Sequence, residues 1–357
     1  MTTVNSSMVV LAREARRMTQ SAVAERANVS QGWVSKLEGG LYPDADSEKL
    51  GRIANVLEVP VSLFLRSGQS YGSTIPMHHR RRQAAPAAAV RQVEAQLNLL
   101  RLRVDALLRS VEIRSDLEFT RMSLDDLGEP EEVARMARVV WRLPNGPIRN
   151  LVALVESAGG IVVRVPFPTT HMDGVSQWIP PSPPTFMLSD ALPWDRLRWT
   201  LAHEIGHVLM HHEPTQDPER EANRFASELL APSSVARADL QQLTLEKAGR
   251  LKPYWGMSMA ALVMRARDLG TISADRARRL MIEISSKGWR KREPLELPPE
   301  PPQILERLVQ MHREHLGFSE DELAGLLGMI PGREEPAFGR PKSESSQRRL
   351  RVVLSSD

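Results

Sequence analysis

The first 66 residues alternate short apolar stretches with polar turns, a pattern that predicts five short helices between residues 8 and 66. Thr19 and Ser30 each stand where a side-chain oxygen can cap the free N–H groups at a helix start. Gln31–Glu38, between Ser30 and the Gly39-Gly40 pair, is therefore expected to be a helix. Apolar side chains fall where two helices that cross at a steep angle would bury them: Val23, Ala27, Val29, Val34 and Leu37.

A second apolar pattern, with alternating spacings of three and four residues, runs from Val90 to Val111. Residues 67–89 before it are rich in Gly, Ser, Pro and Ala and are expected to be a linker. The pattern fits either a helix that packs into the core of the next domain or the seam of a coiled-coil homodimer. Three heptads are the lower limit of a coiled-coil signal, so the core helix is favoured. The seam positions are Val90, Val93, Leu97, Leu100, Val104, Leu107 and Val111.

The remaining pattern predicts mainly helices. The β-branched run 161–167 predicts a strand, with residues 185–188 as its partner. The apolar spacing over 194–212 predicts a long helix, and Asp217-Pro218 starts the next one as N-cap and N1. The expected fold class is therefore mainly α with a small β-sheet. Further helices are expected at 131–141, 148–157, 245–251, 258–269, 274–285, 302–316 and 320–327, and the polar tail 331–357 is expected to be disordered.

Composition restricts the chemistry more than the fold. None of the 357 residues is cysteine, which excludes disulfides, iron–sulfur clusters and thiol nucleophiles, so any metal site must use His, Asp and Glu. The formal net charge is only +3, from 47 basic and 44 acidic side chains, so nucleic acid would have to bind to a local patch. No apolar run is long enough to cross a bilayer, and residues 1–17 lack the order of a signal peptide. We therefore expect a cytoplasmic protein without membrane contact.

The string His203-Glu204-Ile205-Gly206-His207 lies within the expected long helix. Side chains four residues apart on a helix lie one above the other, so the two imidazoles can bind one zinc ion. Glu204 lies close enough to act as a general base on the attacking water. Histidine pairs on helices are more often structural than catalytic. Here apolar positions bury one flank of the helix and a second glutamate-bearing helix follows, so the sequence predicts a Zn²⁺ site.

Two candidates for a third ligand on the same helix or just after it can be excluded. His211 continues the four-residue spacing, but the rise of a straight helix puts it about 12 Å from His203, too far for one ion. Glu213 would need a sharp turn, and Met210 occupies the position where that turn requires glycine.

The next helix offers Glu219 and Glu221. Glu219 shares a helix face with Asn223, whereas Glu221 points about 200° away from Glu219 at 100° per residue. Glu219 is therefore the predicted third ligand, and Asn223 is expected to hydrogen-bond a ligand from outside the metal's own coordination shell. An oxyanion donor is harder to find: His171 is a candidate, but an isolated histidine is more often a surface residue.

Three stretches resemble the motifs of the ImmA/IrrE family of metallopeptidases: Arg198–His207, Glu219–Ala226 and Leu229–Pro232. The sequence differs from the family motifs at Trp199, where Phe is common, and at Ala231, where Met is common. Neither difference affects the residues expected to bind zinc or to act as base. Matching positions elsewhere extend the resemblance over roughly 75–330: Gly146-Pro147-Ile148, Asp173-Gly174, Ser176, Leu251-Lys252, Trp255-Gly256, Ser258-Met259 and Gly288-Trp289-Arg290.

This resemblance implies an α+β zincin-like (gluzincin) domain. It also implies His203, His207 and Glu219 as zinc ligands and Glu204 as catalytic base, in agreement with the helix-face argument. Family members act on very few proteins, often a repressor that they cleave within its DNA-binding region. The resemblance therefore implies a regulatory protein, or this chain itself, as substrate.

Residues 11–57 resemble the Cro/C1-type (XRE) helix-turn-helix class through Thr19-Gln20, Ala24-Glu25 and Val34–Gly40. The resemblance implies that Gln31–Glu38 is the recognition helix in the major groove of double-stranded DNA. Gln31 can pair with adenine, and Lys36 can reach guanine or a phosphate. The near-neutral charge of the segment leaves protein docking open as an alternative. The expected DNA contacts are Gln20, over a phosphate, and Gln31, Gly32, Trp33 and Lys36.

The expected domain order follows from these resemblances. A Cro/C1-type domain at 8–66 is followed by the linker at 67–89 and a helical connector at 90–128. An ImmA/IrrE-type metallopeptidase domain at 129–240 precedes a helical C-terminal region at 241–330 and the tail.

Two functions of different classes fit this organisation. The first is a DNA-binding transcriptional regulator whose zinc endopeptidase domain cleaves a specific regulatory protein or the chain itself. The second is a transcription factor whose peptidase-like domain is a sensor or binding scaffold without turnover. The intact Glu204 favours the first, because binding alone needs no base there. The proline-rich loop 179–184 is expected to frame an extended peptide, which favours a peptide over a small molecule as substrate.

Overall fold

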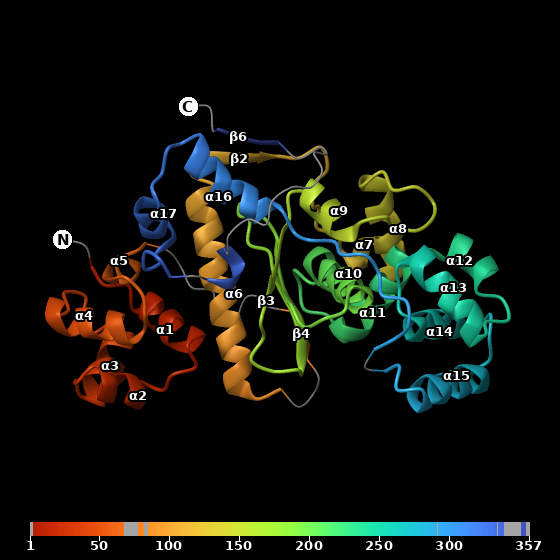
Figure 1. Ribbon diagram of the computed structural model, residues 1–357, viewed down its shortest axis with the longest axis horizontal. Helices are drawn as coiled ribbons and strands as arrows, with labels where there is room; N and C mark the ends of the chain where they lie inside the picture. The colour runs from red at the N-terminus through yellow and green to blue at the C-terminus, as the bar shows by residue number, and fades with distance from the viewer. Residues whose placement is uncertain are drawn as a thin grey trace.

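The computed structural model describes residues 3–67, 78–81, 85–290, 292–333, 335–338 and 351–354. Most of these residues are helical, and one small sheet lies among the helices (Figure 1). The expected fold class, mainly α with a small β-sheet, is confirmed. Within the described ranges no helix is both long and apolar enough to cross a membrane.

Five helices form the N-terminal domain, as the sequence predicts. The side-chain oxygens of Thr19 and Ser30 accept hydrogen bonds from the backbone N–H groups of Ala22 and Trp33, so both are the predicted caps. Val23, Val34 and Leu37 are buried in one core with residues of the other helices. The helices are α1 (Ser6–Ala15), α2 (Gln20–Arg26), α3 (Gln31–Glu38), α4 (Ser47–Val56) and α5 (Val61–Phe64).

Helix α6 (Ala87–Leu107) stands between the N-terminal domain and the rest of the chain (Figure 1). On one side it contacts α1, and its Ala95 and Leu99 belong to the N-terminal core. Its other side carries the apolar residues of the 90–107 pattern, which are at most 9% exposed and pack with the sheet and α16 (Ile304–Glu314). Because these side chains are buried within one chain, core packing accounts for the pattern and leaves them unavailable as a dimer seam. Val111 lies beyond the helix, in a strand.

The sheet has the strand order β1-β4-β5-β3. Strands β3 (Ile161–Val165) and β5 (Thr185–Ser189) are the predicted pair and run parallel, whereas β4 (Met172–Gln177) runs antiparallel to β5. Sequence patterning missed β4, because all six of its residues are buried and polar and apolar side chains do not alternate between core and solvent. Strand β1 (His78–Arg81) pairs antiparallel with β4, so residues 67–89, expected to be a linker, contain a strand.

A separate two-stranded sheet joins β2 (Val111–Arg114) to β6 (Arg351–Leu354) in antiparallel pairing. Strand β6 and a 3₁₀ turn at Pro336–Phe338 lie within the tail for which we expected disorder, so the structure differs from the expectation there. Positions 334, 339–350 and 355–357 of that tail lie outside the described residues.

The remaining helices surround one face of the sheet and form the right-hand side of Figure 1. The long helix α10 (Trp194–Met210) and the helix after it, α11 (Pro218–Leu230), contact each other closely. As predicted, Asp217 caps α11 and Pro218 is its first residue. The others are α7 (Leu124–Leu127), α8 (Pro130–Val140), α9 (Leu151–Ser157), α12 (Ser233–Asp239), α13 (Leu245–Trp255), α14 (Met259–Asp268) and α15 (Ala274–Ser286). Helix α17 (Glu320–Leu327) lies on the other side of the sheet, where it contacts α6, and is on the left of Figure 1.

Buried ionic contacts fix α10 against the segments around it. The Arg198 guanidinium pairs with Glu300 and donates hydrogen bonds to the carbonyls of Gly256 (2.9 Å) and Ile148 (2.7 Å). Glu300 also accepts from the backbone N–H of Leu151 (2.8 Å) at the start of α9. Because these groups are buried and mutually satisfied, they hold one orientation of the helix that carries the histidine pair.

Candidate metal centre and DNA-binding surface

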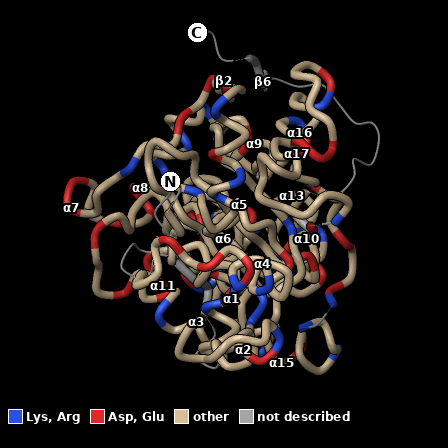
Figure 2. The backbone as a smooth tube through the Cα atoms, turned by 90° about the vertical axis from the view of Figure 1, so that its left-hand side faces the viewer, with Lys and Arg blue, Asp and Glu red and all other residues tan. Residues whose placement is uncertain are grey.

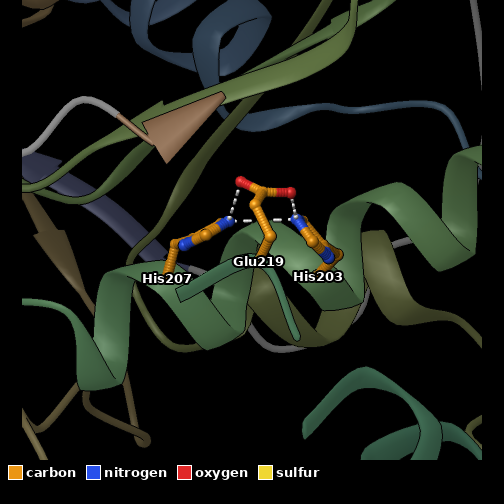
Figure 3. A group of neighbouring side chains, drawn as sticks. All are labelled: His203, His207 and Glu219. Atoms are coloured by element: carbon orange, nitrogen blue, oxygen red, sulfur yellow. Dashed lines mark hydrogen bonds and ion pairs between the residues drawn. The ribbon is translucent and has the colours of Figure 1, made fainter. Parts of the chain in front are cut away.

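Helices α10 and α11 bring three side chains together (Figure 3). His203 and His207 lie one turn apart on α10, 0% and 1% exposed, with 3.0 Å between their Nε2 atoms. Glu219, in the first turn of α11, places its Oε2 3.4 Å from Nε2 of His203 and its Oε1 3.4 Å from Nε2 of His207. Two imidazole nitrogens and one carboxylate therefore converge on one point.

The hydrogen bonds that His203 and His207 make through Nδ1, on the side away from Glu219, determine which ring nitrogens carry hydrogen. His203 Nδ1 lies 3.1 Å from the amide oxygen of Asn223, which only accepts, so Nδ1–H donates and the Nε2 lone pair faces Glu219. On the other ligand, His207 Nδ1 lies 2.8 Å from His211 Nδ1, and His211 Nε2 lies 2.9 Å from Glu221 Oε2. The Glu221 carboxylate accepts from His211, so His211 in turn accepts from His207.

In this arrangement both Nε2 lone pairs and the Glu219 carboxylate face one another. Such a group of acceptors repels itself unless a cation lies between them. Two imidazole nitrogens and one carboxylate form a donor set that suits zinc and leaves a coordination position open for catalysis. The residues present therefore fit a divalent metal, and zinc in particular.

The electrostatics of Glu219 agree with this geometry. Partial burial would raise the pKa of its carboxyl group, but positive charge on the His203 and His207 rings, when these are protonated, outweighs burial and holds that pKa well below its usual range, so Glu219 is a carboxylate. Burial lowers the pKa of His211 despite its contact with Glu221, which keeps the His211 ring neutral. A carboxylate and neutral imidazoles are the protonation states that metal ligation requires.

Glu204 is fully buried and is held by the sheet. The Ser176 hydroxyl on β4 donates a 2.6 Å hydrogen bond to its Oε2. Helix α10 packs directly on β4 at Gly174, where an added Cβ would lie 2.8 Å from Cγ2 of Thr200 and 3.5 Å from Cγ of Glu204. Only the family resemblance drew attention to Ser176 in the sequence, because no local spacing relates residues 176 and 204.

One side of helix α3 is exposed, and the helix lies at the lower end of the N-terminal domain in Figure 1. Gln31, Gly32 and Lys36 are exposed. The Gln31 amide donates a 2.9 Å hydrogen bond to the Gln20 side chain, which donates a 2.8 Å bond to Glu38. Gln31 keeps one N–H and its amide oxygen for a base edge.

Trp33 differs from the other expected contacts. Its ring is half-buried and stacks on Tyr42 at 5.6 Å between centroids, with the Lys49 ammonium 5.7 Å from the ring centroid. The ring therefore packs on its own domain. Charges of both signs are interspersed over the face in Figure 2, which agrees with the near-neutral segment charge.

Two family profiles match the chain. The profile of the helix-turn-helix domain matches residues 11–65, and that of the IrrE N-terminal-like domain matches residues 156–267. The chain therefore joins a segment similar to helix-turn-helix domains of the XRE type to a segment similar to the metallopeptidase-like IrrE domain. No curated protein and no solved structure matches it.

The IrrE-like match contains β3, β4, β5, α10 and α11, and so contains the whole His-His-Glu group. Helix α8 lies before the match yet contacts α11, while α13, which lies beyond position 240, falls inside it. A cleft of about 1530 Å³ runs from Glu219 and Asn223 to α14, α15 and the segment after α15. Its walls include Trp199, Met264, Trp289, Arg220 and Arg290.

The proline-rich loop 179–184 differs from the expectation that it frames a peptide beside the IrrE-like site. Ile179–Ser182 line a separate pocket of about 280 Å³, together with Arg66 after α5 and with Arg101 and Asp105 of α6. The loop thus faces the helix-turn-helix side of the molecule. His171 is half-buried just before β4, and its backbone N–H donates to the Thr169 hydroxyl.

Proposed function

We propose that this protein is a cytoplasmic, DNA-binding transcriptional regulator whose IrrE-like domain is a zinc-dependent endopeptidase. The observation that carries the proposal is the convergence of two imidazole lone pairs and one carboxylate beside the buried Glu204. His203, His207 and Glu219 would hold the zinc ion. When bound, zinc polarises the scissile carbonyl and makes a water more acidic.

The chain's own residues would then handle the proton. Glu204 takes a proton from the attacking water as general base and passes it to the leaving amine as general acid. The Ser176 hydroxyl, 2.6 Å from Oε2, holds that carboxylate in place between β4 and α10. Asn223 holds the His203 ring through its Nδ1–H.

DNA binding would use α3 in the major groove of an operator. Gln31 would pair with adenine while its second N–H stays bonded to Gln20, and Lys36 would reach guanine or a phosphate. Gly32 would permit close approach of the helix, and Trp33 would contribute its exposed edge. A homodimer on a two-fold operator would need a surface other than the buried side of α6.

The proposed substrate is a regulatory protein or the chain itself. Support for the chain itself comes from β1, whose backbone pairs with β4 so that His78 lies opposite Ser176, and which also contacts α10. Adding an extended strand to a sheet edge is a common way to bind a peptide. A cut near β1 would break the covalent link between the helix-turn-helix domain and the peptidase domain.

The decisive experiment compares new protein N-termini in cells that express wild type or Glu204→Gln at equal levels, with and without stress. The proposal expects cuts only with the wild type, in another protein or in this chain. If zinc is bound stoichiometrically by both proteins and no terminus differs, the proposed turnover is wrong. The domain would then be a sensor or scaffold, and selection of DNA sites would define its function.

A further inference from the structure

Two residues that are excluded as metal ligands form a chain of hydrogen bonds behind His207. His211 lies one turn beyond His207 at the end of α10, is 2% exposed, and its ring centroid lies 4.9 Å from that of His207. Its Nδ1 is 2.8 Å from His207 Nδ1, and its Nε2 is 2.9 Å from Oε2 of Glu221 on α11. Glu221 faces His211 because it points away from the side of α11 that carries Glu219.

Only one placement of hydrogens satisfies these contacts when His207 Nε2 presents its lone pair to the metal site. The Glu221 carboxylate accepts, so His211 Nε2 carries the hydrogen and His211 Nδ1 presents a lone pair. His207 Nδ1–H donates to that lone pair, and His207 Nε2 is left to face Glu219 and His203. The chain therefore fixes both the ring orientation and the tautomer of His207.

We propose that His211 and Glu221 are positioning residues of the metal centre, which hold His207 in the state that binds zinc and place a second carboxylate's charge behind that ligand. This inference rests on the proposed zinc site. Partners of this kind orient ligands and raise their basicity. The two ligands differ in this respect, because the outer partner of His203 is the neutral amide of Asn223.

The test compares zinc affinity in four purified full-length variants, by competition with a chromophoric chelator. His211→Leu removes the acceptor for His207 Nδ1–H, so we expect a loss of about 10- to 100-fold. In His211→Gln the amide oxygen can still accept the hydrogen bond from His207 Nδ1–H. In Glu221→Gln the side chain can still accept from His211 but carries no negative charge. Zinc affinity should therefore fall less in these two variants than in His211→Leu. The matched control is His212→Gln, because His212 is the adjacent, half-buried histidine and its Nδ1 has no hydrogen-bond partner.

Two further readouts separate positioning from a general loss of structure. Unfolding of the metal-free proteins should be similar for His211→Gln and His212→Gln. The visible absorption of bound Co²⁺ should change with His211→Leu and Glu221→Gln but not with His212→Gln. If His211→Leu and Glu221→Gln are folded and bind zinc as tightly as the wild type, the inference is wrong. If the wild type itself binds no zinc, the proposed function fails first.

Discussion

Gly206→Ala tests how strongly the metal centre depends on close packing of α10 against α11. In an isolated helix the change would be stabilising by about 0.8–1.0 kcal/mol, the difference in helix propensity between Gly and Ala. In the folded chain the new Cβ would lie 2.9 Å from Cδ1 of Phe225 and 3.3 Å from the Cα of Ala222. Carbon atoms pack best at about 3.5–4.0 Å. The Phe225 ring and the backbone of α11 must therefore shift by several tenths of an ångström.

Forcing an extra carbon into a packed core costs about 1–3 kcal/mol. Subtracting the gain in helix propensity leaves a net loss of unfolding free energy of about 0–2 kcal/mol. The same shift moves Glu219, whose carboxylate oxygens lie 3.4 Å from both Nε2 atoms. We therefore expect zinc affinity to fall by about tenfold, equivalent to about 1.4 kcal/mol.

Urea unfolding of the metal-free proteins and a competitive zinc titration measure the two effects separately. Gly51→Ala in α4 is the matched control, because a Cβ at Gly51 has nothing within 4 Å. This control should be stabilised by up to about 1 kcal/mol and keep its zinc affinity. If Gly206→Ala is stabilised as much as Gly51→Ala and binds zinc as tightly as the wild type, the metal centre does not depend on close contact between α10 and α11.

Three other predictions concern charge, metal and DNA. Burial raises the pKa of Glu156 from 4.5 to about 7, although its carboxylate accepts from the N–H groups of Gln303 and Ile304. Because the pKa of Glu156 is higher in the folded than in the unfolded protein, its contribution to the unfolding free energy is fully present at pH values below the unfolded-state pKa. This contribution is lost as the pH rises through the folded-state pKa of about 7. Between pH 4.5 and 8 the unfolding free energy of wild type should therefore fall by up to about 3 kcal/mol relative to Glu156→Gln, and parallel curves would contradict this. Removing zinc with a chelator should lower the melting temperature of wild type and Glu204→Gln, because a ligand at 1,000 times its Kd stabilises the folded state by about 4 kcal/mol. The melting temperature of Glu219→Ala should fall much less. An equal fall would exclude Glu219 as a ligand. Gln31→Ala should weaken DNA binding by about 1–3 kcal/mol and relax base preference at one operator position, as measured by fluorescence titration. If Lys36 contacts a phosphate, Lys36→Ala should weaken binding to all DNA sequences alike and lower the slope of log binding constant against log salt concentration by about 1. An equal loss of affinity for all sequences with Gln31→Ala would contradict base recognition by Gln31.

The sequence alone determined the features that depend on local geometry. Thr19 and Ser30 cap helices because each lies beside the N–H groups that it binds. His203 and His207 share a side of α10, and Glu219 and Asn223 share a side of α11, because four residues make about one helical turn. Exclusion of His211 as a ligand followed from the helical rise. Each of these predictions needs only one helix.

The tertiary structure decided what no single element contains. The apolar spacing of α6 favoured a core helix but left a dimer seam open, and its packing with the sheet and α16 distinguishes the two. Strand β4 was missed because its polar residues are buried with its apolar ones. The Ser176–Glu204 contact joins residues 28 apart in sequence, and the Glu221–His211–His207 chain joins two helices. The sequence pattern indicates which side of a helix or strand is apolar. Which other helix or strand packs against that side depends on the tertiary structure.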